Sequence, residues 1–206
     1  GMKGICYIVG AGEFTPRSFL PKEGDLVIAA DGGYQSLTAL DIRPGIVVGD
    51  MDSTTQDVVG VPLLRFPVRK DDTDLSLALK LGSLAGYRRF RLYGAGGGPR
   101  EDHFFAAIQL MAGCSKRGME IRLIASAFTL YAITGGSLII PTIPGKIISV
   151  FSYSPESSGV TLRGLDYEEN NLTLQNDVPS GVSNAAAGRR ALISVRRGTL
   201  IIWQTV

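Results

Sequence analysis

The chain changes its pattern near residue 127, and this change most limits the folds open to it. Before it, short apolar runs that end near glycine or aspartate alternate with segments of helical spacing. The runs with strand character are Ile5–Val9, Leu26–Ala30, Ile46–Val48, Leu63–Phe66, Phe90–Tyr93 and Ile121–Ala125. Helical spacing follows Tyr34, Asp74 and Asp102. Such alternation is typical of a parallel sheet covered on both faces.

The second half reads differently. Its short β-rich runs are separated by Gly, Pro, Asn and Ser, and it shows no helical period. This sequence pattern indicates an antiparallel sandwich or barrel. We therefore predict an α/β fold class: a mostly parallel, Rossmann-like N-terminal sheet with flanking helices over residues 1–127, followed by an antiparallel β-sandwich domain over residues 128–206.

Composition excludes two classes of partner. The formal net charge of +2 is too small to favour nucleic acid or a membrane surface. The longest apolar stretch, residues 137–151, is interrupted by Pro141 and Pro144, so we expect no membrane span.

Cys6 and Cys114 lie far apart in apolar surroundings and no N-terminal signal pattern precedes them. We therefore expect reduced core cysteines and a cytoplasmic protein.

A dense acidic cluster opens one of the expected helices. In Lys70-Asp71-Asp72-Thr73-Asp74, three carboxylates fall within four residues. Thr73 or Asp72 can cap the helix, but a cap needs only one such side chain. Carboxylates packed this closely repel one another unless a cation lies among them.

Further aspartates follow two of the expected strands. Asp31 comes after Leu26–Ala30, and Asp50 and Asp52 come after Ile46–Val48. Ligands of open parallel sheets bind beyond the carboxyl ends of the strands. We therefore expect these acids to face one pocket with Asp74, and carboxylates beside phosphates favour Mg²⁺.

A glycine-rich loop, Gly94-Ala-Gly-Gly-Gly-Pro-Arg100-Glu-Asp102-His103, joins a strand to a helix. Glycines allow close approach to a phosphate, and Arg100 can fork onto its oxygens. The alternative is a loop without a ligand in which Asp102 caps the helix. His103, the only histidine, either contacts a phosphate or packs. The Gly-x-Gly at Gly10 lacks the third glycine of a nicotinamide site.

In this order the motifs resemble the thiamine pyrophosphokinase family. The resemblance covers nearly the whole chain and rests on Asp31-Gly-Gly, Gly49-Asp-Met-Asp-Ser53, Lys70-Asp-Asp-Thr-Asp74, Arg100-Glu-Asp-His103, Gly164-Leu-Asp-Tyr167 and Gly181-Val-Ser-Asn184. Two positions depart from the family pattern. Pro99 interrupts the usual Gly-Gly-Arg, and Ala106 or Ala107 stands where an Asn is common.

The resemblance implies transfer of the β,γ-pyrophosphate of ATP to the hydroxyl of thiamine, with release of AMP. It also implies a nucleotide-binding domain over residues 1–127 and a thiamine-binding domain over residues 128–206. The family forms homodimers with active sites at the subunit junction. The expected partners are therefore ATP, thiamine and a second copy of the chain.

The resemblance also assigns roles to individual residues. The metal ligands would be Asp50, Asp52 and Asp74. The catalytic group would comprise Asp31, Lys70, Asp71 and Asp102, where either Asp71 or Asp102 serves as the base. ATP or its phosphates would be bound by Gly32, Ser53, Lys70, Thr73, Gly97, Gly98, Arg100 and His103. Thiamine would be bound by Asp102, Tyr167, Ser183 and Asn184. For Tyr167 and Trp203, a core position is an alternative to stacking on the substrate.

Two other functions fit parts of this pattern. One is another Mg²⁺-dependent phosphotransferase or nucleotidyltransferase that acts on a small alcohol. The other is a non-catalytic nucleotide sensor, for which loss of the acidic residues is the expected mark. Those acids are present.

Overall fold

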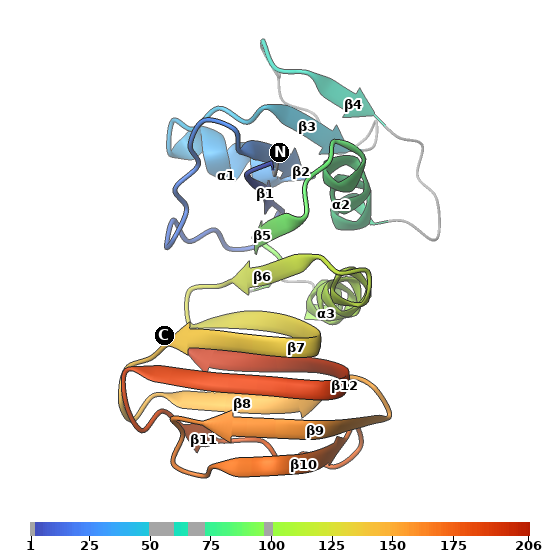
Figure 1. Ribbon diagram of the computed structural model, residues 1–206. Coiled ribbons are helices and arrows are strands. Elements are labelled where there is room, and N and C mark those ends of the chain that lie inside the picture. Colours follow the sequence, from blue (N-terminus) through green and yellow to red (C-terminus); the bar gives the residue numbers. More distant parts are fainter. Residues whose placement is uncertain (1–2, 50–59, 66–72, 97–100) are drawn as a thin grey trace. The chain divides into compact units, whose positions relative to one another are not determined.

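The computed structural model describes residues 3–49, 60–65, 73–96 and 101–206. Strands dominate these residues, as Figure 1 shows. The elements are β1 (Ile5–Val9), β2 (Leu26–Ala30), α1 (Gly33–Ala39), β3 (Ile46–Gly49), β4 (Leu63–Arg65), α2 (Asp74–Leu84), β5 (Arg89–Tyr93), α3 (Glu101–Lys116), β6 (Glu120–Ile124), β7 (Phe128–Pro141), β8 (Ile147–Ser152), β9 (Glu156–Arg163), β10 (Glu169–Gln175), β11 (Asn184–Ala185) and β12 (Arg190–Thr205).

Two compact units divide the chain. The first comprises residues 1–107 and 123–126, and the second comprises residues 108–122 and 127–206. The second unit therefore includes the later part of α3 and the start of β6. The domain boundary after residue 127 stays a prediction.

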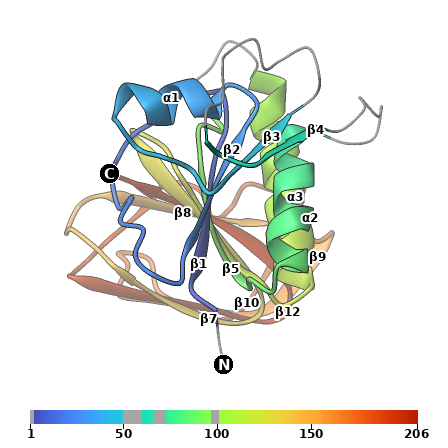
Figure 2. The same cartoon turned by 90° about the horizontal axis from the view of Figure 1, so that it is seen from above.

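In the first unit, five strands lie in the order β5-β1-β2-β3-β4, and each neighbouring pair is parallel. β1 and β2 each carry four consecutive buried residues, as strands covered on both faces do. Both α1 and α2 contact β1 and β2, and Figure 2 shows them beside these strands. The core cluster of this unit includes Val9, Ala29, Leu37 and Val47.

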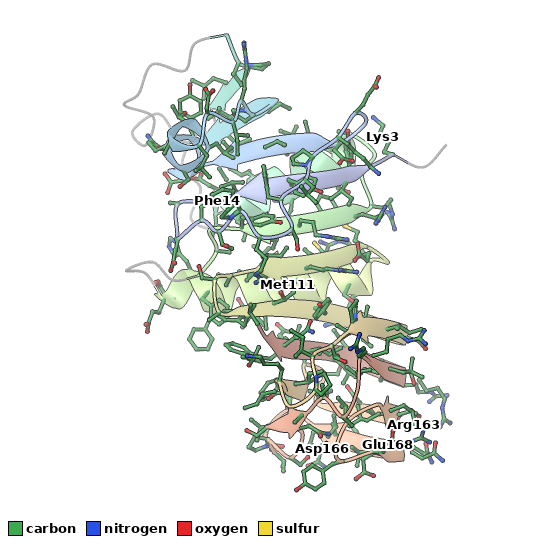
Figure 3. The ribbon with its side chains drawn as sticks, turned by 90° about the vertical axis from the view of Figure 1, so that its left-hand side faces the viewer. Lys3, Phe14, Met111, Arg163, Asp166 and Glu168 are labelled. Atoms are coloured by element: carbon green, nitrogen blue, oxygen red, sulfur yellow. The ribbon has the colours of Figure 1, made fainter. Side chains whose placement is uncertain are left out.

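The connection from β1 to β2 contains no helix. Phe14 and Phe19 from this loop pack edge-on at 5.4 Å between ring centroids. Phe19 also meets Tyr7 at 5.1 Å and Tyr93 at 5.3 Å. Figure 3 shows Phe14 on this loop. An aromatic cluster thus occupies a place that a crossover helix fills in a Rossmann-like sheet.

The predicted fold class is therefore wrong. The described residues form three helices and twelve strands, a strand-rich mixed arrangement rather than an N-terminal Rossmann-like parallel sheet with flanking helices. The physical reason lies in the connections. Prolines at 16 and 21 and the aromatic cluster favour an irregular loop where the alternating pattern suggested a helix-covered sheet.

In the second unit, β12 is the central strand. It pairs antiparallel with β7 along most of its length, with β9 through its first half and with β8 through its second half. The register with β7 shifts between Val195 and Thr199, where Gly198 has a φ of 112°. The core cluster includes Ile148, Val160, Ile193 and Ile202.

β7 and β12 are longer than the sequence predicted. The runs Leu130–Ile133 and Leu138–Ile140 were expected as separate strands, but both belong to β7. Ala191–Val195 and Leu200–Trp203 likewise both belong to β12. None of the helices in the described ranges has the length and apolar character that a bilayer crossing requires.

Candidate functional site

The ends of β1 and β5 meet through glycines. The Gly10 amide donates to the Tyr93 carbonyl and the Gly12 amide to the Gly94 carbonyl, each at 2.7 Å. A Cβ on Gly12 would lie 2.5 Å from the Gly94 oxygen and 2.7 Å from the Gly96 oxygen. Since real Cβ atoms do not approach oxygen this closely, only glycine fits there.

The glycines at 10 and 12 therefore have a structural role that the sequence did not reveal. As an incomplete nicotinamide motif, the Gly-x-Gly sequence indicates no ligand. Its second glycine lies against the glycine-rich loop that follows β5. The signal in the sequence that could have linked the two loops is that each is a glycine-rich turn directly after a strand, and the two strands, β1 and β5, are neighbours.

Asp31 follows β2 in a strained conformation. Its φ is 51°, in the left-handed region that non-glycine residues seldom adopt. Its amide donates to the Val48 carbonyl at 3.0 Å, which ties the end of β2 to β3. Strained residues persist where the surrounding structure holds them, and they cluster at functional sites. Gly32 comes next and is the N-cap residue of α1.

Helix α2 begins at the acidic cluster. Thr73 is its N-cap, and the Thr73 hydroxyl accepts a hydrogen bond from the Ser76 amide at 3.0 Å. Of the two capping residues that the sequence allowed, Thr73 is thus observed in the role. Asp74 lies in the first helical turn, where a negative charge is favoured by the helix dipole.

Helix α3 begins at Glu101, directly after the glycine-rich loop. Asp102 and His103 lie in its first turn and are exposed. Asp102 is therefore inside the helix rather than at its cap position. Both side chains are open to solvent, which a substrate contact requires.

Several predicted site residues lie outside the described residues. They are Asp50, Asp52, Ser53, Lys70, Asp71, Gly97, Gly98 and Arg100. Within the described ranges, no three His, Cys, Asp or Glu side chains gather as metal ligands do. The predicted set of Asp50, Asp52 and Asp74 fits Mg²⁺ by its chemistry, because all three donors are carboxylates.

Three predicted thiamine residues lie in the second unit. Ser183 is exposed, and its φ of 64° is again left-handed. Asn184 is 7% exposed, and Tyr167 is 73% exposed. The core alternative for Tyr167 is therefore wrong. Trp203, in contrast, stacks on Phe128 with ring centroids 3.9 Å apart.

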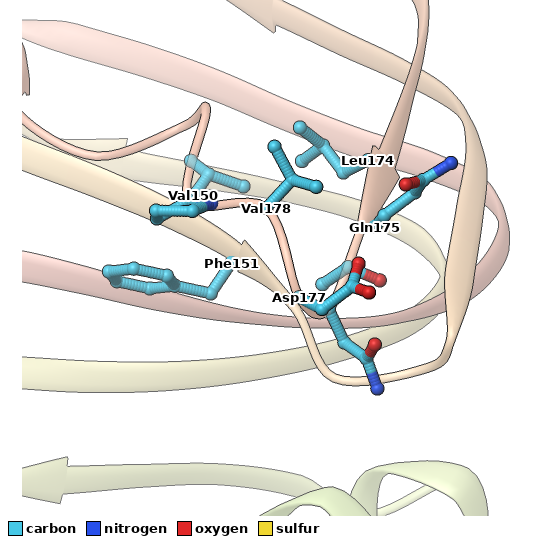
Figure 4. Close-up of a pocket in the computed structure, with 9 residues that line it drawn as sticks. Val150, Phe151, Leu174, Gln175, Asp177 and Val178 are labelled. Carbon is cyan, nitrogen blue, oxygen red and sulfur yellow. The ribbon is translucent and has the colours of Figure 1, made fainter.

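The segment that leads to Ser183 borders a shallow cavity. Its volume is about 170 Å³, and its walls come from β8, the end of β10 and the following loop. Figure 4 shows Val150 and Phe151 on one side, with Leu174, Gln175, Asp177 and Val178 around the rest. The Val150 amide donates to the Gly181 carbonyl at 2.9 Å, which fixes the loop beside β8.

Burial makes both cysteine thiols poor nucleophiles. It raises the pKa of the Cys6 thiol to about 12. Burial also raises the pKa of Cys114, although Arg117 opposes this shift. A thiol that keeps its proton at neutral pH is a poor nucleophile, so neither cysteine supplies the chemistry.

The comparisons with known proteins agree with the sequence motifs. Residues 19–123 match the family model "Thiamin pyrophosphokinase, catalytic domain". Thiamine pyrophosphokinase of Bacillus subtilis (strain 168) is 29% identical over 214 residues, covering 98% of each chain.

Solved structures show the same fold. A crystal structure of thiamine pyrophosphokinase from Bacillus subtilis superimposes with a TM-score of 0.88 at 26% identity, covering 98% of this chain and 99% of that one. Thiamin pyrophosphokinase from Candida albicans gives a TM-score of 0.78 at 15% identity, covering 100% and 90%. Residues 19–123, which match the family model, include Asp31, the aspartates at 50 and 52, the acidic cluster at residues 70–74 and the start of α3. The predicted resemblance to the thiamine pyrophosphokinase family is therefore confirmed. The chain belongs to the thiamin pyrophosphokinase family.

Proposed function

We infer that this protein transfers the β,γ-pyrophosphate of ATP to the hydroxyl group of thiamine, giving thiamine pyrophosphate and AMP. The observation that carries this inference is the family match over residues 19–123, which includes every acidic motif of the first unit. Full-length similarity to the Bacillus subtilis enzyme supports it.

The reaction forms one P–O bond, breaks one P–O bond and moves one proton. The hydroxyl oxygen of thiamine attacks the β-phosphorus of ATP, and the bond from that phosphorus to the oxygen of the α-phosphate breaks. AMP leaves with that oxygen. The hydroxyl proton passes to a carboxylate, for which Asp71 and Asp102 are the candidates. In such transfers the protein mainly positions groups and offsets charge.

We assign the charge-offsetting roles to the acidic and basic residues of the first unit. Asp50, Asp52 and Asp74 would hold Mg²⁺, which neutralises the triphosphate when bound. We assign Lys70 and Arg100 to contacts with phosphate oxygens. Asp31 joins the catalytic group, and its strained backbone supports this assignment.

The remaining nucleotide contacts come from glycines, hydroxyls and one histidine. ATP is assigned to Gly32, Ser53, Thr73, Gly97, Gly98 and His103. The exposure of His103 and the position of Thr73 at a helix start support these two assignments. Residues 1–127 accordingly form the proposed nucleotide-binding domain.

Thiamine is assigned to Asp102, Tyr167, Ser183 and Asn184, with residues 128–206 as the proposed thiamine-binding domain. We also propose a homodimer whose active sites lie at the subunit junction. Exposed apolar side chains of the second unit support an interface: Ile139 is 60% exposed and Ile143 is 62% exposed. A cytoplasmic location remains our expectation, and the buried free cysteines fit a reducing compartment.

Product analysis tests the reaction. Mass spectrometry of a mixture of the protein, ATP, Mg²⁺ and thiamine should show thiamine pyrophosphate and AMP in equal amounts. Asp52→Asn should abolish turnover because a ligand charge is lost. Asp41→Asn is the matched control, since Asp41 is exposed, lies outside the predicted site and has a left-handed φ of 56° that Asn tolerates. Thiamine monophosphate with ADP, or no product at all, would contradict the assignment.

A further inference from the structure

Two exposed side chains of the proposed thiamine site are held in place by two buried ones. Ser183 and Tyr167 are open to solvent, whereas Asn184 is 7% exposed and Ser149 on β8 is 4% exposed. Each buried side chain bonds to the backbone of an exposed residue. Ser149 has no role in the sequence motifs described above.

The Asn184 side chain forms hydrogen bonds with both the amide and the carbonyl of Tyr167. Its Oδ1 accepts from the Tyr167 amide at 3.0 Å, and its Nδ2 donates to the Tyr167 carbonyl at 2.8 Å. Its Oδ1 also accepts from the Ala185 amide at 2.9 Å. Only a carboxamide of this length can both accept and donate here, because a carboxylate has no donor.

The loop that carries Tyr167 is closed at several further points. The Gly164 amide donates to the Glu168 carboxylate at 2.7 Å, and Arg163 donates to the Glu169 carbonyl at 2.9 Å. Figure 3 shows Arg163, Asp166 and Glu168 gathered at this loop. The Asp166 amide also donates to the Ala185 carbonyl at 2.9 Å. Tyr167 therefore extends from a backbone that is fixed on both sides.

Ser149 holds the adjoining turn. Its hydroxyl oxygen accepts from the Ser183 amide at 2.9 Å. Ser183 has a φ of 64°, which a serine adopts only when its surroundings enforce it. Gly181 adds a second constraint, because a Cβ there would lie 2.1 Å from the Val150 oxygen. Removal of the Ser149 hydroxyl would free Ser183 to leave the left-handed region.

We propose that Ser149 and Asn184 are positioning residues that hold Ser183 and Tyr167 in the one arrangement that presents them to the aminopyrimidine ring of thiamine. This inference rests on the proposed function. It gives Asn184 a share in thiamine binding that acts through the Tyr167 backbone, and it adds Ser149 to the site. Preorganised contacts bind more tightly because the cost of ordering is met before the substrate arrives.

A pair of serine variants tests the proposal. Ser149→Ala removes the hydroxyl that holds Ser183. Ser157→Ala is the matched control, because Ser157 is fully buried in the same unit and bonds to Ser152 at 2.6 Å rather than to the turn. Both variants lose a buried hydroxyl, so both should lower Tm by similar amounts.

The kinetic constants should separate the two variants. Ser149→Ala should raise the KM for thiamine roughly tenfold, the usual effect of one lost hydrogen bond, with the KM for ATP unchanged. Ser157→Ala should leave both KM values near those of the parent. Preference for thiamine over an analogue with oxygen in place of the pyrimidine amino group should also fall in Ser149→Ala only. Ser149→Thr, which keeps the hydroxyl, should restore the parental KM.

Each other outcome is decisive. Equal KM values for thiamine in the two alanine variants would overturn the proposal while leaving the proposed function intact. If the parent makes no thiamine pyrophosphate, the proposed function fails and this inference fails with it. If Ser149→Ala does not fold, Asn184→Asp gives the comparison, because it keeps the acceptor for the Tyr167 amide and replaces the Nδ2 donor by a charged oxygen that cannot donate to the Tyr167 carbonyl. A KM for thiamine that stays parental in a folded Asn184→Asp would likewise overturn the proposal.

Discussion

Gly33 lies closer to a neighbouring strand than any other residue type would allow. A Cβ at this position would be 1.8 Å from the Val9 carbonyl oxygen. Helix α1 therefore begins with its backbone in contact with the end of β1. Asp31 and Gly32, two predicted site residues, join β2 to this helix.

Gly33→Ala should accordingly be severely destabilising. We expect the free energy of unfolding to fall by about 3 kcal/mol or more, because the backbone of α1 must move away from β1. Gly113→Ala is the control with the opposite sign. Gly113 lies inside α3, and the nearest atom to its added Cβ is the flexible Arg117 guanidinium at 3.4 Å. That variant should gain about 0.5–1 kcal/mol of stability.

Urea denaturation of both variants checks this prediction. A Gly33→Ala protein within about 0.5 kcal/mol of the parent would mean that the contact with Val9 relaxes at little cost.

Some residue roles could be read from the sequence, and others could not. The cap at Thr73 can be predicted because it depends only on neighbouring residues. The Thr73 hydroxyl lies three residues before an amide that has no acceptor within the helix. The exposure of Tyr167 and the role of Ser149 depend on contacts between segments far apart in the chain. Ser149 contacts a residue 34 positions away, and no local pattern marks it.

At the scale of elements, helix α2 begins where the acidic cluster ends. Thr73 caps it, Asp74 complements its dipole, and Ala78, Leu79 and Gly82 are buried. The capping role of Thr73 is observed, whereas its contact with ATP remains a proposal. The two roles differ in what their loss would change.

Thr73→Ala should lower the free energy of unfolding by about 1 kcal/mol, because the Ser76 amide loses its acceptor. Thr73→Ser keeps an acceptor and should remain within about 0.5 kcal/mol of the parent. Thr38→Ala, at an exposed position inside α1, is the control and should change stability little. Thermal and urea unfolding give the comparison. Equal stability of the Ala and Ser variants at position 73 would show that the cap contributes nothing.

Elements were easier to predict than their assembly. The helices expected after Tyr34, Asp74 and Asp102 are present as α1, α2 and α3. The spacing of apolar residues within a short stretch is enough to predict such helices. The fold class was wrong because period says little about how connections run, and the helix-free loop after β1 is held by Phe14 and Phe19. The glycine pair at 135 and 136 also suggested a break where β7 continues.

At the scale of the whole molecule, the proposed dimer has a sharp test. Asp52→Asn and Asn184→Ala should each leave a homodimer with little or no activity. If each active site combines the first unit of one chain with the second unit of its partner, a mixed dimer has one intact site. Random re-pairing makes half of the dimers mixed, so about a quarter of parental activity should return.

The complementation needs proof that subunits exchange. Differently tagged chains that copurify after mixing provide it, and light scattering gives the mass of the assembly. A monomer, or no recovery of activity despite proven exchange, would contradict a site shared between subunits.

The central position of β12 affects how the second unit is made in the cell. β7, β8 and β9 all pair with a strand that is synthesised after them. A growing polypeptide on the ribosome must therefore carry three open strand edges until Arg190–Thr205 has emerged. Such pairing is distant in sequence and slow to form. Protection of the nascent chain, rather than its final stability, then becomes the condition for a good yield.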